Sequence, residues 1–129
     1  MAMTGKFVLS ASDNYEAFLK AGGACDEAIK KASAAKPTLD IVESATGVTI
    51  TTSAGDQSAT NVITYGQDSP AELAGRKFTV NVSKTSSGYS GTLTLEGKTG
   101  QISADIDGST LTRTMTYDGV TTKRTFTKQ

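Results

Sequence analysis

The sequence predicts an all-β fold: a ten-stranded up-and-down antiparallel β-barrel, capped by a short helix-turn-helix near the N-terminus. The helical period is confined to the first part of the chain and disappears at Thr38. From there on, short runs of threonine, valine and isoleucine are separated by turn residues at spacings near ten. Because no long crossover segment interrupts these runs, hairpins are expected, and closure into a barrel removes the exposed edges of such a meander. A β-sandwich is the alternative fold.

The N-terminal part is expected to contain one strand and two short helices. The segment GKFVLS, residues 5–10, is typical of a short strand. The next segment, SDNYEAFLKAGG, predicts an amphipathic helix with Asp13 as its N-cap and Glu16 three residues on, ended by a pair of glycines. A second helix is expected to begin near Asp26 and to be ended by Pro37.

Nine further strands are expected after the helices, joined by turns such as ATG, AGDQ, EGKTG and two Asp-Gly pairs. We place these strands at 38–44, 47–53, 59–65, 68–73, 76–84, 88–95, 99–106, 110–117 and 120–127. The length of 129 residues fits one compact domain, so residues 1–129 are expected to form a single barrel.

The composition narrows the range of functions. Thirteen basic and thirteen acidic residues cancel, so the net charge favours neither nucleic acid nor an anionic membrane as the main partner. Histidine is absent, which removes the usual general base and the commonest zinc ligand. The single cysteine, Cys25, cannot form an internal disulfide, and we expect a small, partly buried side chain there. The N-terminus lacks a secretory pattern and no stretch approaches the length of a membrane span, which predicts a cytoplasmic protein.

The last two strands carry two arginines on a face that is otherwise apolar. Asp118-Gly119 is the dipeptide of a type I′ turn, and its register puts Arg113 directly opposite Arg124. The same face carries residues that are expected to point into the barrel: Leu111, Met115, Tyr117, Val120 and Phe126. The outward alternative would expose all of them. Like charges opposite each other repel, more strongly when buried, so the inward arrangement requires an anion.

Three sources of that anion are open: ordered water with counter-ions, a carboxylate elsewhere in the barrel, or a bound ligand. Guanidinium groups suit a carboxylate because their forked donors meet both oxygens. The preceding strand is expected to continue the same face through a turn at Asp107-Gly108, which pairs Ala104 with Leu111. A barrel with a carboxylate receptor inside predicts a binding protein for an acidic apolar molecule.

Four segments occur in an order and at spacings that resemble one family. GKFVLSASDNYEAFLKAGG resembles its opening strand and first helix, AAKPTLDI the start of its second strand, AGRKFTVNV its central turn and strand, and YDGVTTKRTF its final hairpin. The family is that of the intracellular lipid-binding proteins, the fatty-acid-binding and cellular retinoid-binding proteins, and the final hairpin is most similar to intestinal-type fatty-acid-binding members. The resemblance implies a calycin-like barrel with a water-filled cavity that takes one or two long-chain acids or similar lipids.

The resemblance also implies a headgroup site. Members commonly hold the ligand carboxylate through two arginines and a tyrosine, the last arginine lying in an Arg-x-Tyr motif that here reads RTF. Arg124 matches that arginine, and Phe126 replaces the tyrosine. The other family arginine falls at Ala104, and Arg113 is expected to lie diagonal to this position, within reach as its substitute. We expect the headgroup at Arg124, Arg113, Tyr117 and Phe126.

A cavity and a portal follow from the same reading. The residues expected to line the cavity are Tyr15, Phe18, Ile41, Ile50, Ile63, Tyr65, Val80, Val82, Leu93, Ile102, Ala104 and Met115. The portal, where the ligand passes between the helices and the adjoining turns, is expected at Ile29, Asp56 and Gly75. Small or short side chains at inward-facing candidates leave room for a bulkier ligand, namely Asn61, Gly91, Ala104 and Thr122.

The main hypothesis is a carrier that binds and transports a long-chain fatty acid or similar hydrophobic carboxylate, without enzymatic activity, cofactor or metal. The alternatives are a bulkier ligand, such as a retinoid, sterol-like acid or pigment, and an enzyme acting on a bound lipid. A membrane-stacking role goes with strong positive charge, which this chain lacks. We expect a monomer with no nucleic-acid partner. Lys30 and Lys31 predict transient membrane contact, unless they only form a solvated helix face.

Overall fold

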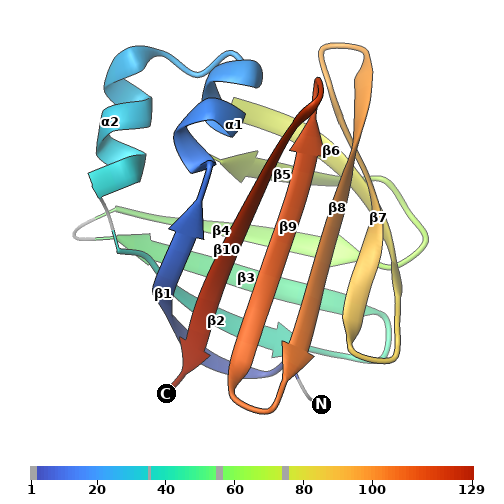
Figure 1. The fold of residues 1–129 in the computed structure, drawn as a ribbon. Coiled ribbons are helices and arrows are strands. Elements are labelled where there is room, and N and C mark those ends of the chain that lie inside the picture. Colours follow the sequence, from blue (N-terminus) through green and yellow to red (C-terminus); the bar gives the residue numbers. More distant parts are fainter. Residues whose placement is uncertain (1–2, 35, 55–56, 74–75) are drawn as a thin grey trace.

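The structure, a computed structural model, describes residues 3–34, 36–54, 57–73 and 76–129 (Figure 1). Strands and helices follow one another in the order that the sequence predicts, and the bounds of the nine later strands agree with the prediction to within two residues. The elements are β1 (Gly5–Asp13), α1 (Tyr15–Ala21), α2 (Asp26–Ala34), β2 (Thr38–Glu43), β3 (Gly47–Ala54), β4 (Gln57–Thr64), β5 (Ser69–Leu73), β6 (Arg76–Lys84), β7 (Gly88–Leu95), β8 (Lys98–Asp107), β9 (Thr110–Tyr117) and β10 (Val120–Lys128).

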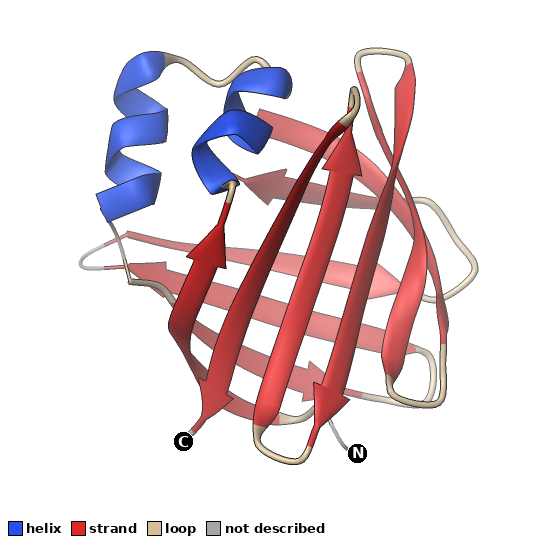
Figure 2. Cartoon of the chain, in the orientation of Figure 1, coloured by secondary structure: helices blue, strands red, loops and turns tan. Residues whose placement is uncertain are grey.

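The ten strands form one antiparallel sheet that wraps into a nearly closed barrel, in the order β4-β3-β2-β1-β10-β9-β8-β7-β6-β5. Strands next to each other in sequence are paired, except β4 and β5, which form the two edges of the sheet, and β1 also pairs with β10, which joins the first strand to the last. Helices α1 and α2 lie together at one end of the barrel (Figures 1 and 2). The predicted up-and-down barrel with a helical cap is confirmed, and the sandwich is not adopted.

A single hydrophobic core fills the inner face of the sheet. In β2, the inward residues Leu39 and Ile41 are buried whereas Asp40 and Val42 are exposed, which is the period of two expected of a strand. In β9, Leu111 and Met115 are buried in the same way. The inner face of β2 also carries an acid, Glu43, whose side chain is only 3% exposed. The threonine-rich positions of the sequence therefore form the outer face.

The hairpin of β9 and β10 has the predicted register. Asp118 and Gly119 both have positive φ angles, 51° and 80°, as a type I′ turn requires. Tyr117 accordingly faces Val120, and the pairing continues along the two strands. The turn chemistry alone was sufficient to determine which residues of these strands are opposite each other.

The turn between β8 and β9 differs from the prediction. Its two central residues are Gly108 and Ser109, because β8 extends to Asp107 and the φ angle of Gly108 is 62°, which suits glycine at the first central position. The register therefore shifts by two residues, and Ala104 pairs with Arg113 instead of Leu111. A shift of two keeps every side chain on its predicted face, since the period of a strand is two.

The junction of β1 and α1 also differs from the prediction. Asp13 is not the N-cap, because β1 continues to this residue and its carbonyl oxygen accepts a hydrogen bond of 2.7 Å from the hydroxyl of Thr122 in β10. Asn14 is the N-cap and adopts a φ angle of 60°, a conformation that asparagine tolerates. Its amide nitrogen donates to the carbonyl oxygen of Thr121 at 2.9 Å. The helix thus begins where the chain leaves the sheet.

The two edge strands, β4 and β5, are connected through side chains. The amide of Asn61 in β4 accepts a hydrogen bond from the Glu72 N–H at 3.1 Å and donates to the Glu72 carbonyl oxygen at 3.4 Å. Near the end of β4, the Thr64 N–H donates to the hydroxyl of Ser69 at 2.9 Å. Asn61, which is opposite the buried Ile50, therefore links the two edge strands through its side chain.

The helices are short. None of the described helices is long and apolar enough to cross a membrane. Cys25 directly precedes α2, where its carbonyl oxygen accepts a hydrogen bond of 3.0 Å from the Ile29 N–H, and its side chain is exposed, not partly buried as expected.

Candidate ligand-binding site

Five residues from five adjacent strands lie in one row across the inner face of the barrel. In the strand order β1, β10, β9, β8 and β7 they are Ser12, Arg124, Arg113, Ala104 and Tyr89, each opposite the next. We call this set the arginine row. Because neighbouring strands are about 4.8 Å apart, the row spans roughly 19 Å.

Both arginines of the row are on the inner face. Arg124 is 6% exposed, and Phe126, two positions further along the same face, is 1% exposed. Arg113 is half-buried and alternates with the buried residues Leu111 and Met115. Two guanidinium groups on directly paired residues therefore share the apolar interior.

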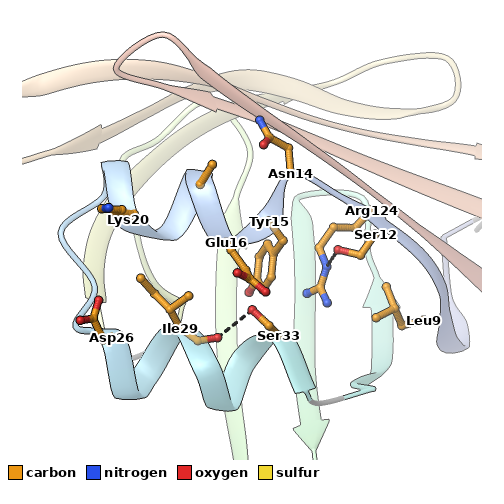
Figure 3. A pocket seen from close by; sticks show the side chains of 11 residues that line it. Leu9, Ser12, Asn14, Tyr15, Glu16, Lys20, Asp26, Ile29, Ser33 and Arg124 are labelled. Atoms are coloured by element: carbon orange, nitrogen blue, oxygen red, sulfur yellow. Dashed lines mark hydrogen bonds between the residues drawn. The ribbon is translucent and has the colours of Figure 1, made fainter.

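The guanidinium of Arg124 is held by its neighbours in the protein. Its central carbon lies 3.7 Å from the centre of the Tyr15 ring, which comes from α1. Its Nε donates a hydrogen bond of 3.2 Å to Oγ of Ser12 in β1. Figure 3 shows Arg124 between these two side chains. A cation over an aromatic face is favourable, so the helical cap and the barrel together orient this arginine.

The Arg124 guanidinium is a cation that is largely removed from water, and its pKa reflects this. Burial lowers the pKa of the Arg124 guanidinium, Tyr15 opposes this change, and Arg113 lowers the pKa further. Burial also raises the pKa of Tyr15, against the influence of both arginines. Tyr15 thus stays neutral at physiological pH and offers Arg124 a ring without a charge. A nearby anion would reduce the cost of burying two like charges.

The guanidinium of Arg113 is less well accommodated. Its Nε is buried and has no hydrogen-bond partner among the described residues. The ion pairs of the described part of the chain involve other cations, and the buried acid Glu43 is engaged by Tyr65 and Lys84. A carboxylate elsewhere in the barrel, one of the sources considered from the sequence, therefore does not serve this pair within the described residues.

A pocket of about 640 Å³ lies between the two helices and the adjoining strands β1 and β10 (Figure 3). It is lined by Leu9, Ser12, Asn14, Tyr15, Glu16, Ala17, Lys20, Asp26, Ile29, Ser33 and Arg124. A second pocket of about 460 Å³ adjoins it between the helices and shares Ile29. Of the predicted portal residues, Ile29 therefore lies at an opening that leads to Arg124. Asp56 and Gly75 lie outside the described residues.

The predicted cavity-lining residues, apart from Tyr65, are all buried in the common core. Gly91 and Thr122, which suggested a larger cavity, have other reasons for their size. A Cβ at Gly91 would lie 2.0 Å from the carbonyl oxygen of Asn81 in β6, so glycine is required there by the close approach of two strands. The hydroxyl of Thr122 is bonded to the backbone of β1. For Ala104, a buried residue between Arg113 and Tyr89, no hydrogen bond or close backbone contact of this kind accounts for the small side chain.

Two predicted site tyrosines use their hydroxyl groups within the protein. The hydroxyl of Tyr117 donates to the Leu95 carbonyl oxygen at 2.7 Å. The hydroxyl of Tyr65 donates to a carboxylate oxygen of Glu43 at 3.3 Å. Burial and Glu43, with a smaller effect of Tyr89, raise the pKa of Tyr65 to about 12. Neither hydroxyl is free to act on a headgroup.

Sequence reasoning missed three residues of the inner face, Ser12, Glu43 and Tyr89. A β-bulge between Leu9 and Ala11 shifts the alternation of β1 by one residue and brings Ser12 to the inner face. No sequence signal marks this bulge. Glu43 and Tyr89, in contrast, alternate with residues that the sequence places inside, so the period of two was sufficient to find them.

The chain is similar to known proteins along its whole length. Residues 1–129 match the model of the lipocalin / cytosolic fatty-acid binding protein family. The liver fatty acid binding protein 1-A of Danio rerio is 32% identical over 125 residues, which cover 96% of this chain and 95% of that protein. The liver-type fatty acid-binding protein of Epinephelus coioides is 31% identical and covers 96% of each chain. The similarity of the final hairpin to intestinal-type members stays a prediction.

Solved structures show the same fold. The Schistosoma mansoni fatty acid binding protein in complex with arachidonic acid superposes with a TM-score of 0.89 at 23% identity, over 99% of this chain and 96% of that chain. Human cRBP IV superposes with a TM-score of 0.84 at 22% identity, over 100% and 99%. With the fold, the full-length family match and the sequence relatives in agreement, the chain belongs to the lipocalin / cytosolic fatty-acid binding protein family.

Proposed function

We propose that the protein is a non-catalytic carrier that binds a long-chain fatty acid, or a similar hydrophobic carboxylate, inside its barrel and holds the carboxylate at Arg113 and Arg124. The observation that carries this proposal is the directly paired arginines on the inner face, which form no ion pair with a described carboxylate. The names of the relatives, fatty acid-binding proteins, support the class of ligand.

The apolar interior supplies the energy of binding. Buried apolar residues on the inner face of the strands form one core cluster, and Leu111, Met115 and Phe126 are the members next to the two arginines. Burying about a dozen methylenes at about 0.8 kcal/mol each contributes on the order of 10 kcal/mol before entropy losses. This contribution is sufficient for micromolar or tighter binding after those losses.

The helical cap is the proposed route of the ligand. The pocket between α1, α2 and the strands extends from Ile29 to Arg124, so a carboxylate that passes the helices meets Arg124 first. Lys30 and Lys31 of α2 are exposed, and Lys31 forms an ion pair of 3.3 Å with Glu27. We propose that these lysines make brief contacts with anionic membranes. We also propose a monomer acting in the cytoplasm, as the description of the family supports.

A bulkier ligand is the second candidate, and one position favours it. Ala104 stands where the resemblance places an arginine, so a ligand there would meet a methyl group in place of a long side chain. The other small residues give no such room, because Asn61 bridges strands, Gly91 is required by close packing and Thr122 is hydrogen-bonded. An enzyme on this barrel has little support, since the hydroxyls of its tyrosine candidates are engaged.

Binding of a long-chain fatty acid and of the matching fatty alcohol, measured by calorimetry, tests the proposal. We expect the acid to bind wild type, and Arg113→Gln and Arg124→Gln each to weaken this binding about tenfold or more, because each removes a charged donor. The two substitutions should change the affinity for the fatty alcohol only a little, because the alcohol carries no charge.

Lys98→Gln is the matched control. Lys98 is exposed and pairs with Asp118 at 3.5 Å, so this variant changes the net charge equally without touching the interior. The proposal fails if both arginine variants keep the affinity of wild type, or if wild type binds the alcohol as tightly as the acid.

A further inference from the structure

We propose that the carboxylate of the ligand lies over Ala104 of β8 and is held between Nε of Arg113 and the hydroxyl of Tyr89. This inference rests on the proposed function and adds a specificity-determining residue, Tyr89, to it. It places the headgroup on the side of Arg113 that faces β8 and β7, along the arginine row.

The first support is a pair of buried donors. Nε of Arg113 and the hydroxyl of Tyr89 are both buried and lack a hydrogen-bond partner among the described residues. Tyr89 is 1% exposed. Buried polar groups are almost always hydrogen-bonded, and each exception calls for an explanation. Because these two unsatisfied donors lie in the same row of the sheet, we look for a single explanation of both.

The second support is the residue between them. Ala104 is opposite Arg113 on one side and opposite Tyr89 on the other. The Cα atoms of the two donors are therefore roughly 10 Å apart, since two strand spacings separate them. Both side chains are long and rise from the same face as the single methyl group of Ala104. An acceptor group between the two donors would lie above this methyl group, with one donor on either side.

The third support is that comparable groups nearby are satisfied. Arg124 donates to Ser12 and lies against the ring of Tyr15. The hydroxyls of Tyr65 and Tyr117 donate to Glu43 and to the backbone of β7. Nε of Arg113 and the hydroxyl of Tyr89 are thus the donors of the row that are both buried and without a partner in the described part of the protein.

The chemistry of the two donors selects the ligand group. Arg113 supplies a charged N–H and Tyr89 a neutral O–H, and a carboxylate accepts one hydrogen bond at each of its two oxygens. An ester or an alcohol at the same place has no negative charge, so the guanidinium would bind it more weakly than a carboxylate. Arg124, one strand further along the row, adds attraction at longer range.

Tyr89→Phe tests the inference, because it removes the hydroxyl and keeps the ring. We expect about tenfold weaker binding of a long-chain fatty acid, as for the loss of a hydrogen bond to a charged group, and unchanged binding of its methyl ester. The melting temperature without ligand should be equal to that of wild type or higher, because an unsatisfied buried group is removed. A residue with a purely structural role would not combine weaker binding with equal or greater stability.

Thr85→Val is the matched control. The hydroxyl of Thr85 is also buried without a described partner, but it lies in the hairpin between β6 and β7 and outside the arginine row. This variant should bind the acid like wild type. In the double variant Arg113→Gln/Tyr89→Phe, the loss should be smaller than the product of the single losses, because the two donors act on one group.

The outcomes separate this inference from the proposed function. If wild type binds no fatty acid, the proposed function fails and the inference with it. If the two arginine variants weaken binding and Tyr89→Phe does not, the carrier stands and the inference is wrong. Equal losses for the acid and its methyl ester in Tyr89→Phe would also overturn the inference, since the hydroxyl would then not recognise the carboxylate.

Discussion

At the scale of the residue, two identical side chains differ through their surroundings. Arg124 is oriented before any ligand binds, by a hydroxyl from β1 and a ring from α1. Arg113, its direct cross-strand neighbour, has a buried Nε without a described partner. Donors that are already oriented bind at a lower entropic cost, whereas an unsatisfied donor gains most from an acceptor. The pairing of the arginines was predictable from one turn, but this difference was not.

Tyr65 provides a prediction at the same scale that needs no ligand. Burial and Glu43 raise its pKa from 10.0 to about 12 in the folded protein. The folded state therefore keeps this proton where the unfolded chain has lost it. The contribution of the hydroxyl to stability is complete below about pH 10 and is lost as the pH rises towards about 12.

Urea unfolding between about pH 9 and pH 12 measures this effect in wild type and Tyr65→Phe. Wild type should lose stability more steeply than the variant across this range, so the difference between them should shrink at high pH. Parallel curves would show that the bond between Tyr65 and Glu43 does not contribute as described.

At the scale of the element, turns and bulges decide which side chains meet. The Asp118-Gly119 turn was read correctly because both positive φ angles belong to residues that favour them. The turn at Gly108-Ser109 was misplaced because Asp107-Gly108 offers an equally good dipeptide one residue earlier. The bulge in β1 had no sequence signal, because it arises from the pairing with β10.

The bridge between β4 and β5 provides a prediction at this scale. Asn61→Ala removes the acceptor of the Glu72 N–H, which no neighbouring backbone of β4 replaces in the described structure. We expect the exchange of the Glu72 amide hydrogen to become roughly five- to tenfold faster, as for the loss of about 1 kcal/mol of local stability. Hydrogen exchange followed by nuclear magnetic resonance gives this rate.

Asn81→Ala is a suitable control. The amide of Asn81 donates to the side chain of Asp68 at 3.0 Å, so its loss leaves the backbone of β5 unchanged. An equal exchange rate at Glu72 in wild type and Asn61→Ala would mean that the side chain of Asn61 does not hold the two edges together.

At the scale of the whole molecule, the barrel and its helical cap both contribute side chains to the proposed site. The sheet buries a continuous apolar face and supplies both arginines, and α1 supplies the ring against Arg124. The pocket beneath the helices leads to the same arginine. A ligand in the interior would therefore contact the sheet and the cap, and would stabilise the fold as a unit.

Linkage between ligand and folding gives a prediction at this scale. A fatty acid at a hundred times its Kd should raise the free energy of unfolding by about 2.7 kcal/mol in wild type. At the same concentration, Arg113→Gln with a tenfold weaker Kd should gain only about 1.4 kcal/mol. Urea unfolding with and without the acid measures both values, and equal gains in the two proteins would contradict the role of Arg113.

Sequence patterns were sufficient to predict the all-β barrel, the two short helices, the bounds of the nine later strands to within two residues and the pairing of Arg113 with Arg124. These features depend on local signals, namely the period of two, the turn dipeptides and the helix ends, which a chain carries in consecutive residues. The surroundings of the arginines, in contrast, depend on contacts between distant segments. Ser12 and Arg124 are 112 positions apart, and the row to Tyr89 forms only when five strands assume their registers. Contacts across a closed sheet depend on every turn and bulge between them, so no single segment encodes them.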